Sequence, residues 1–83
     1  MKVDNKKSNV RHNILMRLIS MEKQGSGYDH NNPIPEDIVA EIRKEADVLT
    51  EKIYPIYLQR RDAPLWLNRQ LKDPNWIMEI YES

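Results

Sequence analysis

Two histidines carry the most versatile side-chain chemistry in this chain of 83 residues, because imidazole binds metal ions and transfers protons near neutral pH. His12 and His30 lie eighteen positions apart, a spacing that does not bring them onto one metal ion through a shared helical face. The chain contains no cysteine, which excludes thiolate ligands and disulfides. We therefore expect no metal site and no bound cofactor.

The segment around His30 is the other place where catalytic or ligand-binding side chains gather. Residues 29–31 match the opening of a calcium-binding loop, but Ile34 takes the place of its glycine and Ala40 the place of its bidentate glutamate. Tyr28 and His30, with a basic residue, would supply acid and base to a small nuclease or toxin-like enzyme. No nucleophile elbow or phosphate-binding glycine loop accompanies them. We therefore predict a protein that is not an enzyme and keep the nuclease as an alternative.

Charge is distributed unevenly along a chain whose formal net charge is zero. Residues 1–24 hold six basic and two acidic side chains, whereas residues 25–58 hold three basic and seven acidic ones. Lys6, Lys7 and Arg11 are the predicted phosphate contacts if nucleic acid is a partner. The two oppositely charged segments would also attract each other within one molecule. This internal attraction favours a protein partner over nucleic acid.

Aromatic residues concentrate in the C-terminal part, where five of the six follow position 53 and none is phenylalanine. Tyrosine and tryptophan combine a large apolar area with a polar tip and are enriched at protein interfaces. We therefore predict a surface that binds another protein. Its residues are Tyr54, Tyr57, Trp66, Trp76 and Tyr81. We expect Trp76 to remain partly exposed, since a short last helix carries more apolar area than one groove hides.

The elements that position these residues are helices, because apolar residues recur with helical spacing and no strand-like alternation competes. Residues 1–8 are predicted to be a flexible basic N-terminus, and residues 9–83 a single domain. Within it, residues 9–24 form an amphipathic helix that stops at a left-handed Gly25, and residues 25–34 form a polar loop.

The strongest helical pattern covers residues 35–61, where one apolar stripe runs from Ile38 to Tyr57. Pro55 interrupts the backbone hydrogen bonding, so we predict a kinked helix and keep an end at Tyr54 as the alternative. Such a helix is about 40 Å long, which exceeds what the other helices would cover. The uncovered length of the apolar stripe predicts a homodimer in which two copies pack along it. The alternative is that the stripe is buried in the core of a single chain. The predicted seam consists of Ile42, Leu49, Ile53 and Ile56.

Two short helices are predicted to follow, each after an aspartate that would cap it and with a proline in the first turn. They start near residues 62 and 73. The fold class is therefore all-α, a small domain of three or four helices.

These features predict a non-catalytic protein that binds another protein stoichiometrically, such as a small regulator or inhibitor. The alternative is a DNA-associated transcriptional regulator with a helix-turn-helix core. Its first helix would be residues 35–43, its turn residues 45–47, and its DNA-reading helix residues 48–60. No signal-peptide pattern and no apolar stretch of membrane-spanning length occurs in the chain, so we expect a cytoplasmic protein without a membrane partner.

Overall fold

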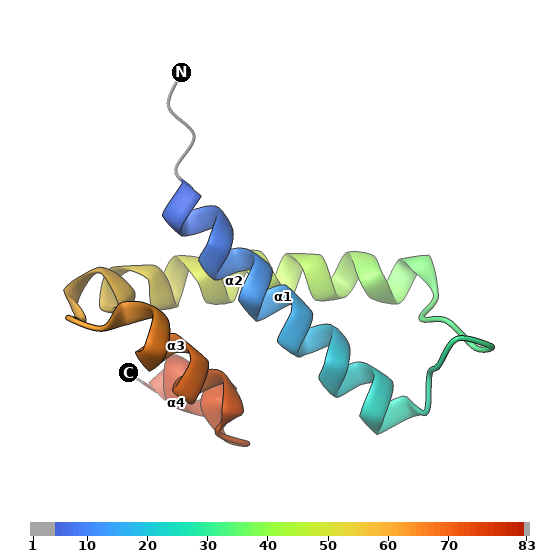
Figure 1. The fold of residues 1–83 in the computed structure, drawn as a ribbon. Helices are drawn as coiled ribbons and strands as arrows, with labels where there is room; N and C mark the ends of the chain where they lie inside the picture. The colour runs from blue at the N-terminus through green and yellow to red at the C-terminus, as the bar shows by residue number, and fades with distance from the viewer. Residues whose placement is uncertain (1–4, 83) are drawn as a thin grey trace.

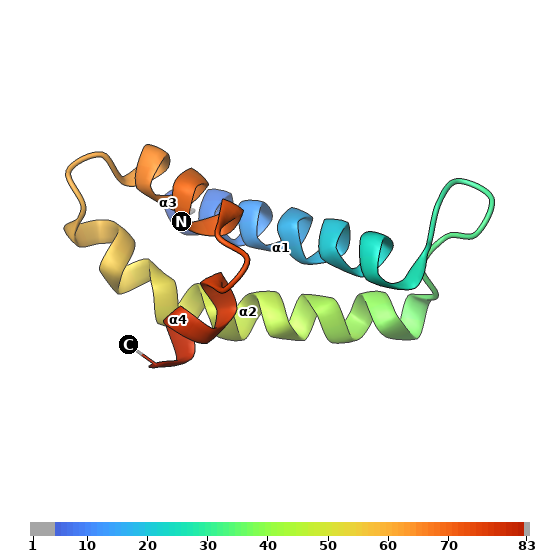
Figure 2. The same ribbon diagram turned by 90° about the horizontal axis from the view of Figure 1, so that it is seen from below.

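Two long helices cross each other, and two short helices pack against one end of the pair (Figures 1 and 2). The computed structural model describes residues 5–82, and over this range it contains no strand. The helices are α1 (Asn5–Ser26), α2 (Glu36–Gln59), α3 (Ala63–Lys72) and α4 (Trp76–Glu82). The predicted all-α fold is therefore confirmed.

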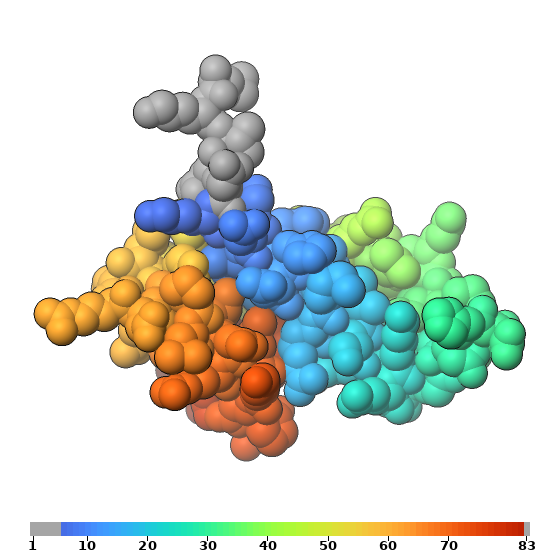
Figure 3. Space-filling view, viewed as in Figure 1, coloured from blue at the N-terminus to red at the C-terminus, as the bar shows by residue number. Residues whose placement is uncertain are grey.

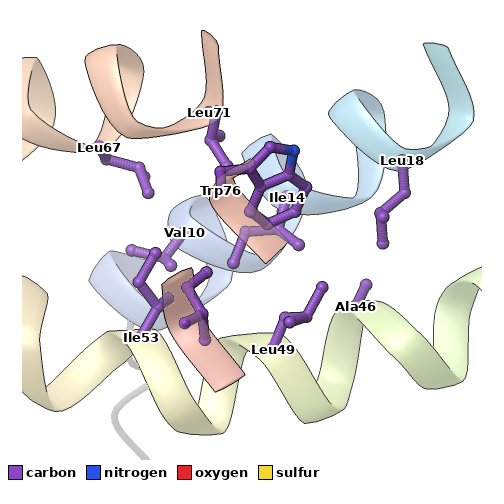
Figure 4. Packing of buried hydrophobic residues seen from close by; sticks show 10 residues of the cluster. Val10, Ile14, Leu18, Ala46, Leu49, Ile53, Leu67, Leu71 and Trp76 are labelled. Carbon is purple, nitrogen blue, oxygen red and sulfur yellow. The ribbon is translucent and has the colours of Figure 1, made fainter. Parts of the chain in front are cut away.

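The core lies where α1 crosses α2 and where α3 and α4 close over the crossing (Figure 4). Each helix contributes apolar residues three or four positions apart, the spacing that places side chains on one helical face. The buried set is Val10, Ile14, Leu18, Ala46, Leu49, Ile53, Leu67, Leu71, Trp76 and Ile80. Four separate segments must therefore come together before this core is closed.

α1 is longer at both ends than its sequence pattern predicts. Residues 5–8, expected in a flexible N-terminus, form its first turn, while residues 1–4 of that segment lie outside the described part of the chain. At the other end the helix continues through Gly25, so the predicted stop there is wrong. Gly27 takes the left-handed conformation instead, with φ 73°. The amides of Gly27 and Tyr28 both donate to the carbonyl oxygen of Lys23, at 2.9 and 3.2 Å, which satisfies the helix end.

The two glycines give a matched pair of substitutions with opposite expected effects. Gly25→Ala should raise the free energy of unfolding by about 0.5–1 kcal/mol, because Gly25 is helical and a Cβ there meets no atom within 4 Å. Gly27→Ala should lower it by about 1–2 kcal/mol, because an L side chain strains the left-handed backbone. Urea denaturation followed by circular dichroism measures both values. Equal effects of the two substitutions would contradict the helix end described here.

α2 passes through Pro55 without a break and ends at Gln59, so the alternative end at Tyr54 is wrong. Ile53 before the proline is fully buried, and Ile56 and Tyr57 after it are partly buried. Packing on both sides of Pro55 therefore offsets the cost of about 3 kcal/mol that an interior proline imposes on a helix. The kink itself stays a prediction.

The unbroken course of α2 contradicts the helix-turn-helix alternative. That arrangement requires a turn at residues 45–47, yet α2 is helical throughout this segment. Thr50 Oγ1 also donates to the carbonyl oxygen of Ala46 at 2.6 Å, a bond one helical turn long. The alternative division of residues 35–60 into two helices is therefore wrong, because the apolar stripe keeps one phase along α2.

The two short helices begin differently from each other. Asp62 makes no side-chain capping bond, contrary to the prediction, and only its backbone oxygen accepts from the amide of Trp66, at 2.9 Å. Asp73 does use its side chain, because its Oδ1 accepts from the amide of Asn75 at 2.9 Å. This turn leads the chain into Trp76, the first residue of α4.

The residues of the predicted dimer seam are largely buried by contacts within a single chain. α1 has 22 residues and is about 33 Å long, so it covers more of α2 than the predicted helix of residues 9–24 would. Leu49 and Ile53 have no exposed surface, while Ile42 and Ile56 are partly buried. A contact between two copies could not use Leu49 or Ile53 without opening the core. Self-association itself stays a prediction.

Candidate functional site

The end of the α1–α2 pair that α3 and α4 leave uncovered contains a groove. α3 and α4 pack beside the C-terminal half of α2, whereas the end of the pair next to the connecting loop has no third helix over it (Figure 2). A groove of about 490 Å³ lies between the last turns of α1 and the first turns of α2. We call it the acidic groove. Its lining residues are Leu18, Met21, Glu22, Ile38, Glu41, Ile42 and Glu45.

Helical spacing explains why apolar and acidic side chains meet in this groove. On α2 the four lining residues occupy positions i, i+3, i+4 and i+7, and on α1 the three occupy i, i+3 and i+4. Each helix therefore presents apolar residues and at least one glutamate on the same face. The result is an apolar floor beside three carboxylates.

The three carboxylates have only neutral or distant partners among the described residues. Glu22 accepts a hydrogen bond from Ser26 Oγ at 3.1 Å, and Glu41 Oε1 lies 4.0 Å from Lys44 Nζ. Glu45 accepts from the hydroxyl of Tyr81 at 2.8 Å. An exposed ion pair at 4.0 Å neutralises little of the charge. The groove therefore keeps a negative character.

Tyr81 joins α4 to the end of the acidic groove. Its hydrogen bond to Glu45 raises the pKa of the phenol above its usual value, with smaller contributions from desolvation and from the negative charge of Glu45. Lys52 Nζ lies 5.2 Å from the centre of its ring, and 47% of the residue is exposed. Of the five predicted aromatic partner residues, Tyr81 is the one that contacts a groove-lining carboxylate.

The other four aromatic residues have neighbours different from those of Tyr81. Tyr54 and Tyr57 stack with ring centres 6.1 Å apart. The Trp66 ring lies 5.1 Å from the guanidinium carbon of Arg60. Trp76 is fully buried in the core, so the expectation that it stays partly exposed is wrong. α4 packs its Trp76 face against α2 and α3, and Trp76 joins the buried cluster to which all four helices contribute, so more apolar area is hidden than the sequence indicates.

The predicted phosphate contacts on α1 are largely engaged by α2. Lys7 pairs with Glu51, and Arg11 Nε lies 2.5 Å from Asp47 Oδ1. Attraction between the basic and acidic segments inside one molecule is therefore confirmed for Lys7 and Arg11. Lys6 is exposed at the start of α1. A phosphate that bound at Lys7 or Arg11 would have to compete with a carboxylate already in place.

The two histidines lie in different parts of the fold, whereas Tyr28 and His30, considered for catalysis, share the connecting loop. His12 is exposed on α1, whereas His30 is exposed in the connecting loop. Asp29 Oδ1 accepts the amides of Asn31 and Asn32, both at 2.9 Å, so this carboxylate closes the loop on itself. Across residues 5–82 no group of three or more His, Asp or Glu side chains is arranged to hold a metal ion.

Sequence reasoning missed the acidic groove, although one signal for it was present. Glu41 and Glu45 lie three and seven positions after Ile38, at the border of the apolar stripe rather than opposite it.

Within the described helices, none has the length and apolar character needed to cross a bilayer. No protein-family model, curated sequence or solved structure matches the chain.

Proposed function

We propose that this chain is a non-catalytic binding protein that receives a basic, amphipathic helix of a partner protein in the acidic groove. The observation that carries the proposal is the combination found there: an apolar floor left uncovered by α3 and α4, bordered by Glu22, Glu41 and Glu45. Stoichiometric binding of this kind is how small regulators and inhibitors act.

The shape of the groove favours a helix as the ligand. Two helices with an apolar strip between them present the type of site into which an amphipathic helix lays its apolar face. Met21 and Ile38, both partly buried, are apolar side chains that such a helix would cover. Lysine or arginine on the flanks of the partner helix would face the three glutamates. Complementary charge of this kind accelerates encounter and selects the partner.

The proposal is tested with two synthetic helical peptides that share leucines at i and i+4 spacing. One peptide carries lysines on its flanks, and the other carries glutamates at the same positions. Fluorescence anisotropy should show saturable binding of the basic peptide only, weakening as salt is added. Glu22→Lys combined with Glu41→Lys should weaken that binding about tenfold or more, because like charges then face each other.

The matched control is Asp62→Lys combined with Glu82→Lys, which changes the net charge equally. Both residues are exposed, and neither lines the groove. This control should bind the basic peptide as the unmodified chain does, apart from a small general charge effect. Equal weakening by the two double variants would show that only net charge matters, and the acidic groove would lose its role.

A further inference from the structure

A second hollow, of opposite chemical character, lies between α1 and α3. The cavity has a volume of about 400 Å³. Figure 3 faces the seam between these helices, with α1 in blue and α3 in orange. A neighbouring cavity of about 270 Å³ shares Asn13, Pro64 and Leu67 with it and adds Asn9, His12 and Tyr57. We call the two together the basic trench.

The polar groups of the basic trench are cations and amides. Arg17 and Lys72 line the larger cavity, together with the side chains of Asn13 and Asn68. Among the described residues that line either cavity, none is an aspartate or a glutamate. The trench therefore offers two positive charges and several hydrogen-bond donors without a carboxylate to neutralise them.

Arg17 differs from the other α1 cations described above, because part of its guanidinium is buried without a partner. Its Nε has no hydrogen-bond partner within the described part of the chain and is shielded from solvent. By contrast, Arg11 on the same helix directs its Nε to Asp47. Buried donors in folded proteins almost always have an acceptor. Because this nitrogen has almost no solvent-accessible surface, a ligand in the trench would reach it only after the guanidinium turns toward the cavity.

We propose that the basic trench binds the phosphate group of a small phosphate monoester. Such a group carries a charge of about −1.5 to −2 at pH 7 and three strong acceptor oxygens. Arg17 and Lys72 match that charge, and the planar guanidinium fork can donate to two oxygens of the tetrahedral phosphate at once. The amides of Asn13 and Asn68 supply further donors. The organic part of the ligand would occupy the neighbouring cavity beside Tyr57 and His12.

Nuclear magnetic resonance of the full chain tests this site directly, because arginine Nε–H groups give resolved signals in ¹⁵N spectra. The probes are inorganic phosphate, adenosine monophosphate and adenosine, at constant ionic strength held with sodium chloride. Both phosphates should move the signals of Arg17 Nε–H and of the Asn68 side-chain amide saturably, and adenosine should not. Tighter binding of the monophosphate, with shifts at Asn9, identifies an ester as the ligand, whereas equal affinities identify free phosphate.

Three variants test whether phosphate binds in the basic trench. Arg17→Gln should weaken phosphate binding about tenfold or more, as expected for loss of a charge-assisted bond. Lys72→Gln, at an exposed residue that leaves the core untouched, should weaken it several-fold. Lys23→Gln removes the same charge from an exposed position of α1 outside the trench and should have little effect. Absence of saturable shifts, equal shifts with adenosine, or equal weakening by Lys23→Gln would each overturn the proposal.

Discussion

Trp76→Ala is expected to lower the free energy of unfolding by about 3–5 kcal/mol, the usual cost of removing a large buried aromatic side chain. Trp76 has no exposed surface and lies within the cluster that joins all four helices (Figure 4). A domain of this length has a total stability on the order of 4–12 kcal/mol. The variant should therefore be largely unfolded or melt far below the unmodified chain, as measured by circular dichroism on heating and in urea.

Two further variants of α4 separate lost packing from other effects. Met78→Ala, at a residue that is 60% exposed, should change stability by less than about 0.5 kcal/mol. Trp76→Phe should cost much less than the alanine variant, because it keeps an aromatic ring and removes a buried Nε1 that has no partner among the described residues. A Trp76→Ala variant that melts with the unmodified chain would contradict the core described here.

Leu49→Glu is expected to abolish most of the helical signal. Leu49 is fully buried at the crossing of α1 and α2, so the variant would place a carboxylate inside an apolar cluster. Burial of an unpaired charge costs several kcal/mol even after relaxation, which is a large part of the stability of so small a domain. Far-ultraviolet circular dichroism and light scattering on the same sample measure helicity and oligomeric state.

The neighbouring residue provides the control for this substitution. Val48 is 45% exposed on the same turn of α2, so Val48→Glu should leave helicity unchanged and alter stability only slightly. If Leu49→Glu remains helical and instead converts a dimer to a monomer, then Leu49 belongs to a seam between copies. That result would restore the prediction made from the length of the apolar stripe.

The existence and order of the helices were predictable because each carries its own periodic pattern. Ile38, Leu49 and Ile53 keep one phase along α2, and the Asp-Pro pair at residues 73–74 marks the start of α4. Helix ends were less predictable. Gly25 and Gly27 are two positions apart, and only the bonds to the carbonyl of Lys23 show which of them ends α1.

The candidate sites depend on how the helices cross, and the spacing of residues along the sequence does not reveal this crossing. The acidic groove exists because α1 and α2 leave an uncovered end, and the basic trench because α3 returns alongside α1. Composition correctly indicated an abundance of tyrosine and tryptophan near the C-terminus, but it could not separate the buried Trp76 from the exposed Tyr81. That difference follows from which face of α4 packs against α2 and α3.

The position of Trp76 and Ile80 near the end of the described chain also affects folding during synthesis. Val10 and Ile14 are made early, yet the buried cluster to which they belong is complete only after residue 80 has been added. At typical translation rates, about 3–10 s separate the completion of α1 from the synthesis of Ile80. During that interval the buried cluster lacks its α4 members, Trp76 and Ile80. Proteolytic cleavage in the turn at residues 73–75 would recreate the same incomplete state in the mature protein.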